Sequence, residues 1–114
     1  MIINKTDMKQ EIRKEMRGGN GDVLITHMVP SDSMKNARLM AELSLSPGSG
    51  IGSHRHNKET EYYIITEGSG IVIEDDGSKS VKKGDIVVTG NGASHSIENT
   101  GNTNLKFIAV IITE

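Results

Sequence analysis

Frequent glycines between short apolar segments constrain the fold of this chain more than any other feature. The 114 residues include 13 glycines and two prolines, which interrupt the sequence at short intervals. This punctuation is typical of an all-β domain made of many short strands. A chain of this length forms one domain with a single core, and the sequence shows no internal repeat. We expect an N-terminal segment over residues 1–22 and the β-domain over residues 23–114.

Alternating or continuous apolar residues indicate where the strands lie. Residues 39–45 alternate between an apolar and a mixed face, whereas residues 105–112 are apolar on both faces, which predicts a buried strand. The Asp76-Gly77 pair predicts a tight hairpin turn, because glycine readily adopts positive φ. Eight or nine strands at this spacing favour two packed antiparallel sheets of the jelly-roll type. The expected strands are residues 23–29, 39–45, 51–56, 61–66, 71–74, 80–82, 86–89, 94–98 and 105–112.

The N-terminal segment has a pattern that fits two conformations. Met8, Ile12 and Met16 are four residues apart, Asp7 precedes them as a potential cap, and a glycine pair follows. This spacing predicts a short helix over residues 6–17. The same three apolar side chains also lie on one parity of a strand, so an extended conformation stays open.

Three of the four histidines fall into a pattern that indicates a metal site. His54 and His56 are one residue apart, Glu61 follows, and His95 lies after a later glycine-rich turn. Residues i and i+2 of a strand point to the same face, so two imidazoles at this spacing can reach one ion. Imidazole and carboxylate ligands suit a borderline divalent metal, and the lack of cysteine excludes thiolate sites. His27, the fourth histidine, is expected to be a half-buried polar residue.

The residues around this pattern resemble the two motifs of the cupin superfamily. Residues 48–68 are similar to G-x5-H-x-H-x4-E-x6-G, and residues 84–99 are similar to G-x5-P-x-G-x2-H-x3-N. Gly90 stands where the family usually has proline, and we expect glycine to make the loop before His95 more mobile. The matching positions are Gly48, His54, His56, Glu61, Gly68, Gly84, Gly92, His95 and Asn99.

The resemblance implies a small single-domain cupin, with the strands wound into a jelly-roll barrel or double-stranded β-helix. It also implies that His54, His56, Glu61 and His95 bind one manganese, iron, nickel or zinc ion inside the barrel. Such a ligand set leaves coordination positions open, which is typical of catalytic sites. The expected function is a metal-dependent oxidoreductase, decarboxylase or isomerase acting on a small oxygen-rich, carboxylate-like metabolite. The alternative is a binding or sensing protein in which the metal anchors a ligand without turnover.

Three nearby side chains have competing interpretations. Glu59 shares a parity with Glu61, but the family spacing favours Glu61 as the carboxylate ligand. Tyr63 lies on the face of Glu61 and is the candidate catalytic residue, as a proton donor, while packing is its alternative role. Arg38 would pair with an anionic substrate if its face lines the barrel, although we expect it at the surface.

Composition narrows the expected partners. The net charge of −2 and the scattered lysines argue against a nucleic-acid partner. No apolar run is long enough to span a bilayer and no secretory signal is apparent, so a membrane partner is not expected. Together with the absence of cysteine, this favours the cytoplasm. We expect a small-molecule ligand, and the family resemblance implies a homodimer in which the N-terminal segment pairs with a neighbouring sheet edge.

Overall fold

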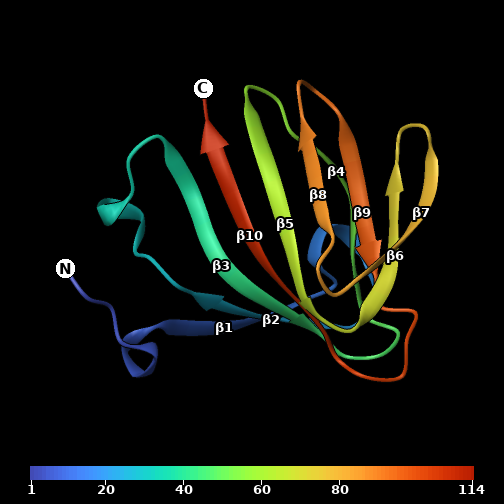
Figure 1. Ribbon diagram of the computed structural model, residues 1–114, viewed down its shortest axis with the longest axis horizontal. Coiled ribbons are helices and arrows are strands. Elements are labelled where there is room, and N and C mark those ends of the chain that lie inside the picture. Colours follow the sequence, from blue (N-terminus) through green and yellow to red (C-terminus); the bar gives the residue numbers. More distant parts are fainter.

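Ten antiparallel strands form two facing sheets in the computed structural model, which describes residues 1–114 (Figure 1). The larger sheet has the order β1-β2-β3-β10-β5-β8 and the smaller sheet the order β4-β9-β6-β7. Three short 3-10 turns lie outside the sheets, and no helix is long and apolar enough to cross a membrane. The strands are β1 (Lys9–Lys14), β2 (Asp22–His27), β3 (Ala37–Leu45), β4 (Gly50–Arg55), β5 (Glu59–Glu67), β6 (Ser69–Glu74), β7 (Gly77–Lys82), β8 (Ile86–Gly90), β9 (Ser94–Glu98) and β10 (Leu105–Thr113). The 3-10 turns are Lys5–Asp7, Met16–Gly18 and Ser31–Ser33.

The all-β architecture predicted from the sequence is confirmed. Each of the nine expected segments corresponds to one of the strands from β2 to β10. The predicted hairpin also forms, because Glu74 of β6 pairs with Gly77 of β7 and leaves only Asp75 and Asp76 between them. Gly77 has a φ of +127°, a conformation that favours glycine.

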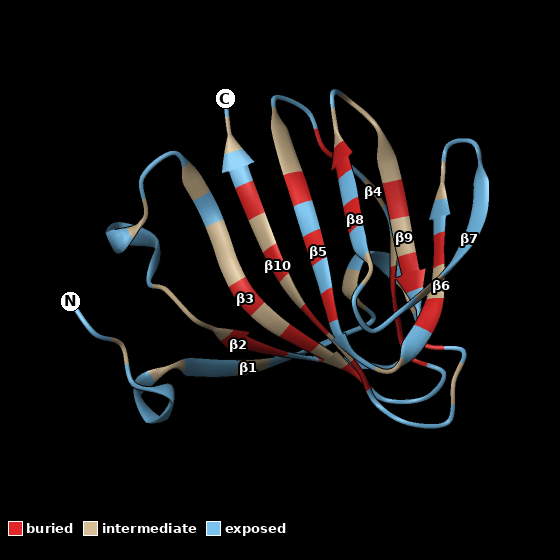
Figure 2. Ribbon diagram, viewed as in Figure 1, coloured by how far each residue is buried: buried red, intermediate tan, exposed pale blue.

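The hydrophobic core fills the space between the two sheets, where buried residues alternate with exposed ones along the strands (Figure 2). The larger sheet contributes opposed residues of β3 and β10, and the smaller sheet contributes Ile51, Val72 and Ile97. Burying one large aliphatic side chain stabilises a fold by about 1.5–3 kcal/mol. The opposed pairs are Ala41 with Ala109, Leu43 with Phe107, and Leu45 with Leu105.

The helix predicted for residues 6–17 is wrong, because this segment contains β1. The register joins Lys9 to His27 and Lys14 to Asp22, so the backbone of β1 forms its hydrogen bonds with β2. Ile12, the central residue of the predicted apolar helix face, is 63% exposed and does not pack against the core. Pairing with a sheet edge therefore outweighs a helix propensity that is weak for so short a segment.

The N-terminal segment contacts the β-domain in two ways. β1 extends the larger sheet at the edge formed by β2 (Figure 1). Met16, in the 3-10 turn after β1, packs against the hydrophobic core. The expected division of the chain at residue 22 stays a prediction.

The central strand β5 positions side chains on both faces of the larger sheet. Glu61, Tyr63 and Ile65 point inward and are 4%, 1% and 2% exposed. Tyr62 and Ile64 point outward and are 36% and 37% exposed. This alternation places Glu61 and Tyr63 between the sheets, beside the histidines of the smaller sheet.

Candidate metal centre

Three histidines and one glutamate meet between the two sheets. His54 lies on β4, His56 follows the end of β4, His95 lies on β9, and Glu61 lies on β5. One ligand atom from each residue lies within 4.8 Å of the others. Because β4 and β9 are neighbours in one sheet, His54 is directly opposite His95 in the register. His56, Glu61 and His95 are buried, so the centre of this cluster is shielded from water.

The atoms that face one another in the cluster are the three Nε2 atoms and Oε1 of Glu61. His95 Nε2 lies 3.0 Å from His54 Nε2, 3.1 Å from His56 Nε2 and 2.9 Å from Glu61 Oε1. His56 Nε2 lies 2.9 Å from the same oxygen. Two ligand atoms that bind one ion at right angles, at about 2.1 Å each, are about 3 Å apart. The spacing therefore fits a single transition-metal ion.

The outer ring nitrogens of His54 and His56 each face a hydrogen-bond acceptor, which determines the tautomer of the ring. His54 Nδ1 is 2.8 Å from the carbonyl oxygen of Gly52, and His56 Nδ1 is 2.6 Å from Oε2 of Glu59. Both oxygens only accept hydrogen bonds, so each Nδ1 donates its proton and Nε2 of the neutral ring keeps a bare lone pair. Partners of this kind orient metal-binding histidines and raise their basicity.

The donor set of the cluster fits a divalent metal. The ring of His95 faces the same point and is held from behind by Thr89, whose Oγ1 lies 2.7 Å from His95 Nδ1. With neutral imidazoles, lone pairs of His54 and His56 face the carboxylate of Glu61 without a proton between them. Buried acceptors this close repel one another unless a proton or a cation lies between them, and a divalent cation would bind all of them at once. The cluster could therefore hold a metal.

The charge states of the cluster are those that bind metals. Burial opposes the ionisation of Glu61, but the adjacent His54 and His95 outweigh it, and the pKa of Glu61 falls to about 2. Burial lowers the pKa of His95 from its ordinary value of 6.5. An ionised carboxylate and a neutral imidazole are therefore present at neutral pH, which is the combination that a divalent metal requires.

Glu59 supports the cluster from outside and is not part of it. Arg38 Nε donates to Glu59 Oε1 at 2.7 Å, and Arg38 Nη2 donates to Oε2 at 2.8 Å. These hydrogen bonds lower the pKa of Glu59 to about 2, so it remains a charged acceptor for His56 Nδ1. The structure thus brings Glu61 to the facing atoms and Glu59 behind the ring. Arg38 is exposed, as expected, and it also contributes to the lining of an adjacent cavity.

Comparisons with known proteins agree with the two motifs. A model of the cupin domain matches residues 41–111, which include all four residues of the cluster. The chain belongs to the cupin family. The predicted membership and the jelly-roll fold are therefore confirmed.

Thermotoga maritima supplies a similar sequence and a similar solved structure over nearly the full length of this cupin. A curated relative named oxalate-binding protein is 43% identical over 113 residues, which are 98% of this chain and 93% of that protein. A crystal structure from the same organism, described as a predicted oxalate decarboxylase, has a TM-score of 0.95, 42% identity and 100% coverage of both chains. A polyketide cyclase from Streptomyces resistomycificus has the same fold at 19% identity, with a TM-score of 0.81 over 100% of this chain and 80% of that one.

Two glycines shape the loop that precedes His95 in this cupin. Gly92 has a φ of +80°, and its N–H donates to the carbonyl of His56 at 2.9 Å, which ties the loop to the end of β4. A Cβ added at Gly90 would lie 2.5 Å from Thr60 Oγ1 on the paired strand β5, so a larger residue at this position would require the Thr60 side chain to move. Greater mobility of the loop stays a prediction.

Tyr63 packs directly against the cluster. Its ring stacks on His95, with centroids 4.8 Å apart and planes at 18°, and it also contacts Phe107 at a centroid distance of 4.5 Å. Burial raises the pKa of Tyr63 well above its ordinary value, and the negative charge of Glu61 adds to this effect. The tyrosine is therefore neutral at physiological pH. Its ring also lines the cavity beside the cluster.

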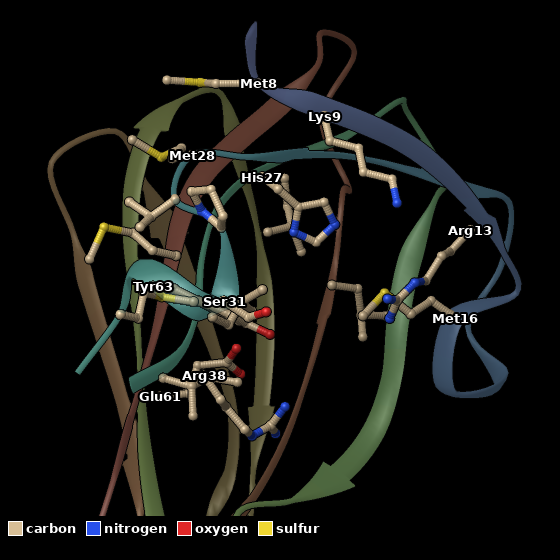
Figure 3. Close-up of a pocket in the computed structure, with 18 of the residues that line it drawn as sticks. Met8, Lys9, Arg13, Met16, His27, Met28, Ser31, Arg38, Glu61 and Tyr63 are labelled. Carbon is tan, nitrogen blue, oxygen red and sulfur yellow. The ribbon is translucent and has the colours of Figure 1, made fainter. Parts of the chain in front are cut away.

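The cluster adjoins a cavity of about 500 Å³ that extends toward β1 and β2 (Figure 3). His54, His56 and Glu61 line one part of it, and His27 lines another part, outside the cluster. Five of the six methionines of the chain also line the cavity. The predicted helix gave no indication that β1 pairs with β2 and so brings Lys9 and Arg13 to this cavity. The five methionines are Met8, Met16, Met28, Met34 and Met40.

Proposed function

We propose that the histidine and glutamate cluster holds one divalent transition metal and that this metal binds a small carboxylate-rich anion. The spacing of the facing atoms supports this proposal, because Nε2 of His95 lies 2.9–3.1 Å from the other two Nε2 atoms and from Oε1 of Glu61, as expected for ligands around one ion. Bound there, manganese, iron, nickel or zinc would supply positive charge and open coordination positions. Oxalate is the first anion to test, since one Thermotoga maritima relative is named an oxalate-binding protein. The proposed ligands are His54, His56, Glu61 and His95.

The charge of the cluster favours an anionic ligand. Glu61 is the only charged group among the proposed ligands, so a divalent ion leaves the centre with a net positive charge. The cluster is buried, and charge interactions are stronger in a buried site than in water. An anion that enters from the cavity would therefore be drawn to the centre.

Calorimetric titration with oxalate tests this function. Metal-loaded protein should bind one oxalate per chain, and metal-stripped protein should bind none. Acetate is the matched control ligand and should bind more weakly. Oxalate can occupy two coordination positions of the metal with one oxygen from each carboxylate, whereas acetate has only one carboxylate. Equal binding of oxalate with and without metal would show that the proposal is wrong.

A metal-dependent reaction at this site is the second candidate function, and Tyr63 supports it. Its hydroxyl stays protonated because burial raises its pKa, and it lies in the cavity wall, so it can donate a hydrogen bond or a proton to a bound ligand. We propose Tyr63 as the catalytic residue, with the reaction class open among oxidoreductase, decarboxylase and isomerase. Tyr63→Phe should leave oxalate affinity unchanged and reduce any turnover by about 100-fold or more, measured as conversion of the ligand to product. Full turnover in this variant would exclude the proposed role.

We also propose that the protein forms a homodimer, through a surface that we name the outer patch. Tyr62 and Ile64 of β5 lie opposite Val88 and Ile86 of β8, and the latter two are 56% and 55% exposed. On the other side of β5, Ile108 and Val110 of β10 pair with Ile64 and Tyr62. The paired side chains across these three strands are therefore all apolar or aromatic, and none is charged. Exposed apolar surfaces of this kind mark interfaces, and an uncharged patch can pair with its own copy. The outer patch consists of Tyr62, Ile64, Ile86, Val88, Ile108 and Val110.

Light scattering coupled to gel filtration tests the dimer. The wild-type chain should elute with twice the monomer mass, and Ile64→Lys should elute as a monomer, because it places a charge in the centre of the outer patch. Ile73→Lys is the matched control, since Ile73 is 48% exposed on the smaller sheet and should leave the dimer intact. Dissociation by both variants, or by neither, would contradict this interface.

A small molecule is the only class of partner that we propose besides a second copy of the chain. The net charge of −2 supports neither a nucleic-acid partner nor an anionic membrane surface. The absence of cysteine is compatible with the reducing cytoplasm, which we propose as the location.

A further inference from the structure

Basic side chains line the part of the cavity that β1 and β2 form. Lys9 lies directly opposite His27 in the register, and Arg13 lies on the same face of β1 because strand side chains repeat every second residue. All three line the cavity that contains the metal centre. Figure 3 shows them extending from β1 and β2 in the upper and right-hand parts of the view, apart from Glu61 and Arg38 below. The cavity thus has a cationic wall away from the proposed metal.

The charges along the cavity favour an anion at this wall. Four basic residues and two acidic residues line the cavity, and Arg38 is already paired with Glu59. Arg13 shares the carboxylate of Glu11 with His27, at 2.7 Å and 3.6 Å. Lys9 forms no salt bridge, so an unpaired ammonium group remains available. The basic residues are Lys9, Arg13, Arg17 and Arg38, and the acidic residues are Asp7 and Glu61.

The space between the cationic wall and the metal centre is larger than oxalate and partly apolar. Cavities of about 300–1,000 Å³ hold ligands far larger than a two-carbon anion, and this cavity of about 500 Å³ lies in that range. The five methionines that line it supply flexible apolar surface, which adapts to ligands of different shape. A ligand with an apolar middle would fill the space that oxalate leaves.

We propose that Lys9, Arg13 and His27 form a second anion-binding position, and that the ligand is a dicarboxylate longer than oxalate. One end, a carboxylate beside a carbonyl or hydroxyl oxygen, binds the metal. An aliphatic middle packs against the methionines, and the second carboxylate contacts the cationic wall. This inference rests on the proposed metal-dependent function and names the class of ligand for it.

Matched ligands separate this inference from the function on which it rests. Metal-loaded protein is titrated with oxalate, with 2-oxo dicarboxylates of five and six carbons, and with the 2-oxo monocarboxylates of the same lengths. Each pair shares the metal-binding end, so the comparison isolates the second carboxylate. At least one dicarboxylate should bind about tenfold or more tightly than its monocarboxylate, as expected for charge-assisted hydrogen bonds. Equal affinities within both pairs, with oxalate still bound, would overturn this inference alone.

Variants of β1 then locate the second position. Lys9→Gln combined with Arg13→Gln should remove the preference for the dicarboxylate, while the affinity for oxalate stays unchanged. Lys14→Gln is the matched control, because Lys14 is on the same strand, points to the opposite face and does not line the cavity. A preference that survives in the double variant would overturn the assignment to this wall. If metal-loaded wild-type protein does not bind oxalate, the proposed function itself is contradicted.

Discussion

The two ends of the cavity are built in opposite ways. At the metal centre, His56 and His95 are at most 2% exposed, and each outer ring nitrogen has a hydrogen-bond partner. At the β1–β2 wall, Lys9 and Arg13 are exposed side chains on an edge strand, and Arg13 is held only by the salt bridge to Glu11. The first end is preorganised before a ligand arrives, whereas the second can adapt to what enters.

This difference indicates how the two ends divide the work of binding. Fixed ligands lose little conformational entropy when they bind a metal, so the buried end is suited to affinity. Long exposed side chains lose more entropy for each contact, but they accept ligands of several lengths and are suited to selecting among them. Substitutions at the metal centre should therefore affect every ligand, and substitutions at the wall only some.

The largest expected effect comes from removing one histidine of the cluster. His56→Ala should weaken metal binding by more than about 100-fold, because only three of the four ligands remain. The variant should still unfold in one cooperative transition, since the apolar core lies mainly on other strands. Metal analysis and thermal unfolding check both statements. His27→Ala is the control and should retain its metal; a metal-free His56→Ala that has also lost cooperative unfolding would refute the second statement.

The second-largest effect is expected from acidification, which should release the metal. Protons compete for the same Nε2 atoms, so metal affinity should fall as pH drops through the histidine range near about 6.5, by up to tenfold per pH unit for each ring involved. Burial lowers the pKa of His95, so competition at this ring begins at lower pH. The pKa of Glu61 is about 2, so its carboxylate stays ionised through this range. Titration against a competing chelator measures the effect, and stoichiometric metal at pH 4 is incompatible with imidazole ligands.

A smaller effect should follow when the support behind a ring is weakened. Glu59→Gln replaces a charged acceptor of His56 Nδ1 with a neutral one and should lower metal affinity by about 10–100-fold. Glu11→Gln removes the equivalent carboxylate from the β1–β2 wall and should leave metal affinity unchanged. Competition with a fluorescent chelator measures both. If both variants change metal affinity to the same extent, the contrast between the two ends of the cavity does not hold.

The smallest effect is expected for stability at the wall. Ile12→Ala on β1 should lower the free energy of unfolding by less than about 1 kcal/mol, because the side chain is 63% exposed. Phe107→Ala, which removes a fully buried ring beneath Tyr63, should cost about 3–5 kcal/mol. Urea unfolding of both variants provides the comparison, and comparable losses would show that β1 is integral to the core.

The sequence was informative at the metal centre because local rules operate there. Strand periodicity placed His54 and His56 side by side, and the motif spacing selected Glu61 over Glu59. The structure places these residues together, with His95 opposite His54 on the neighbouring strand. The role of Glu59 behind His56 was not foreseen, because it depends on how the chain turns between β4 and β5 and on Arg38 from a third strand.

The β1–β2 wall could not be predicted in the same way. Met8, Ile12 and Met16 fit both a helical stripe and one strand parity, and only pairing with β2 decides between them. That pairing joins residues up to 18 positions apart, such as Lys9 and His27, so no local pattern reveals it. The cavity was missed for the same reason, since its lining comes from segments that approach only in the folded chain.

Metal content tests the central claim most directly. Protein purified without a metal-affinity step should contain, or take up on exposure to manganese, iron, nickel or zinc, about one equivalent of metal per chain by elemental analysis. The four facing ligand atoms predict this stoichiometry. A folded wild-type protein that binds none of these metals at stoichiometric level would contradict the account.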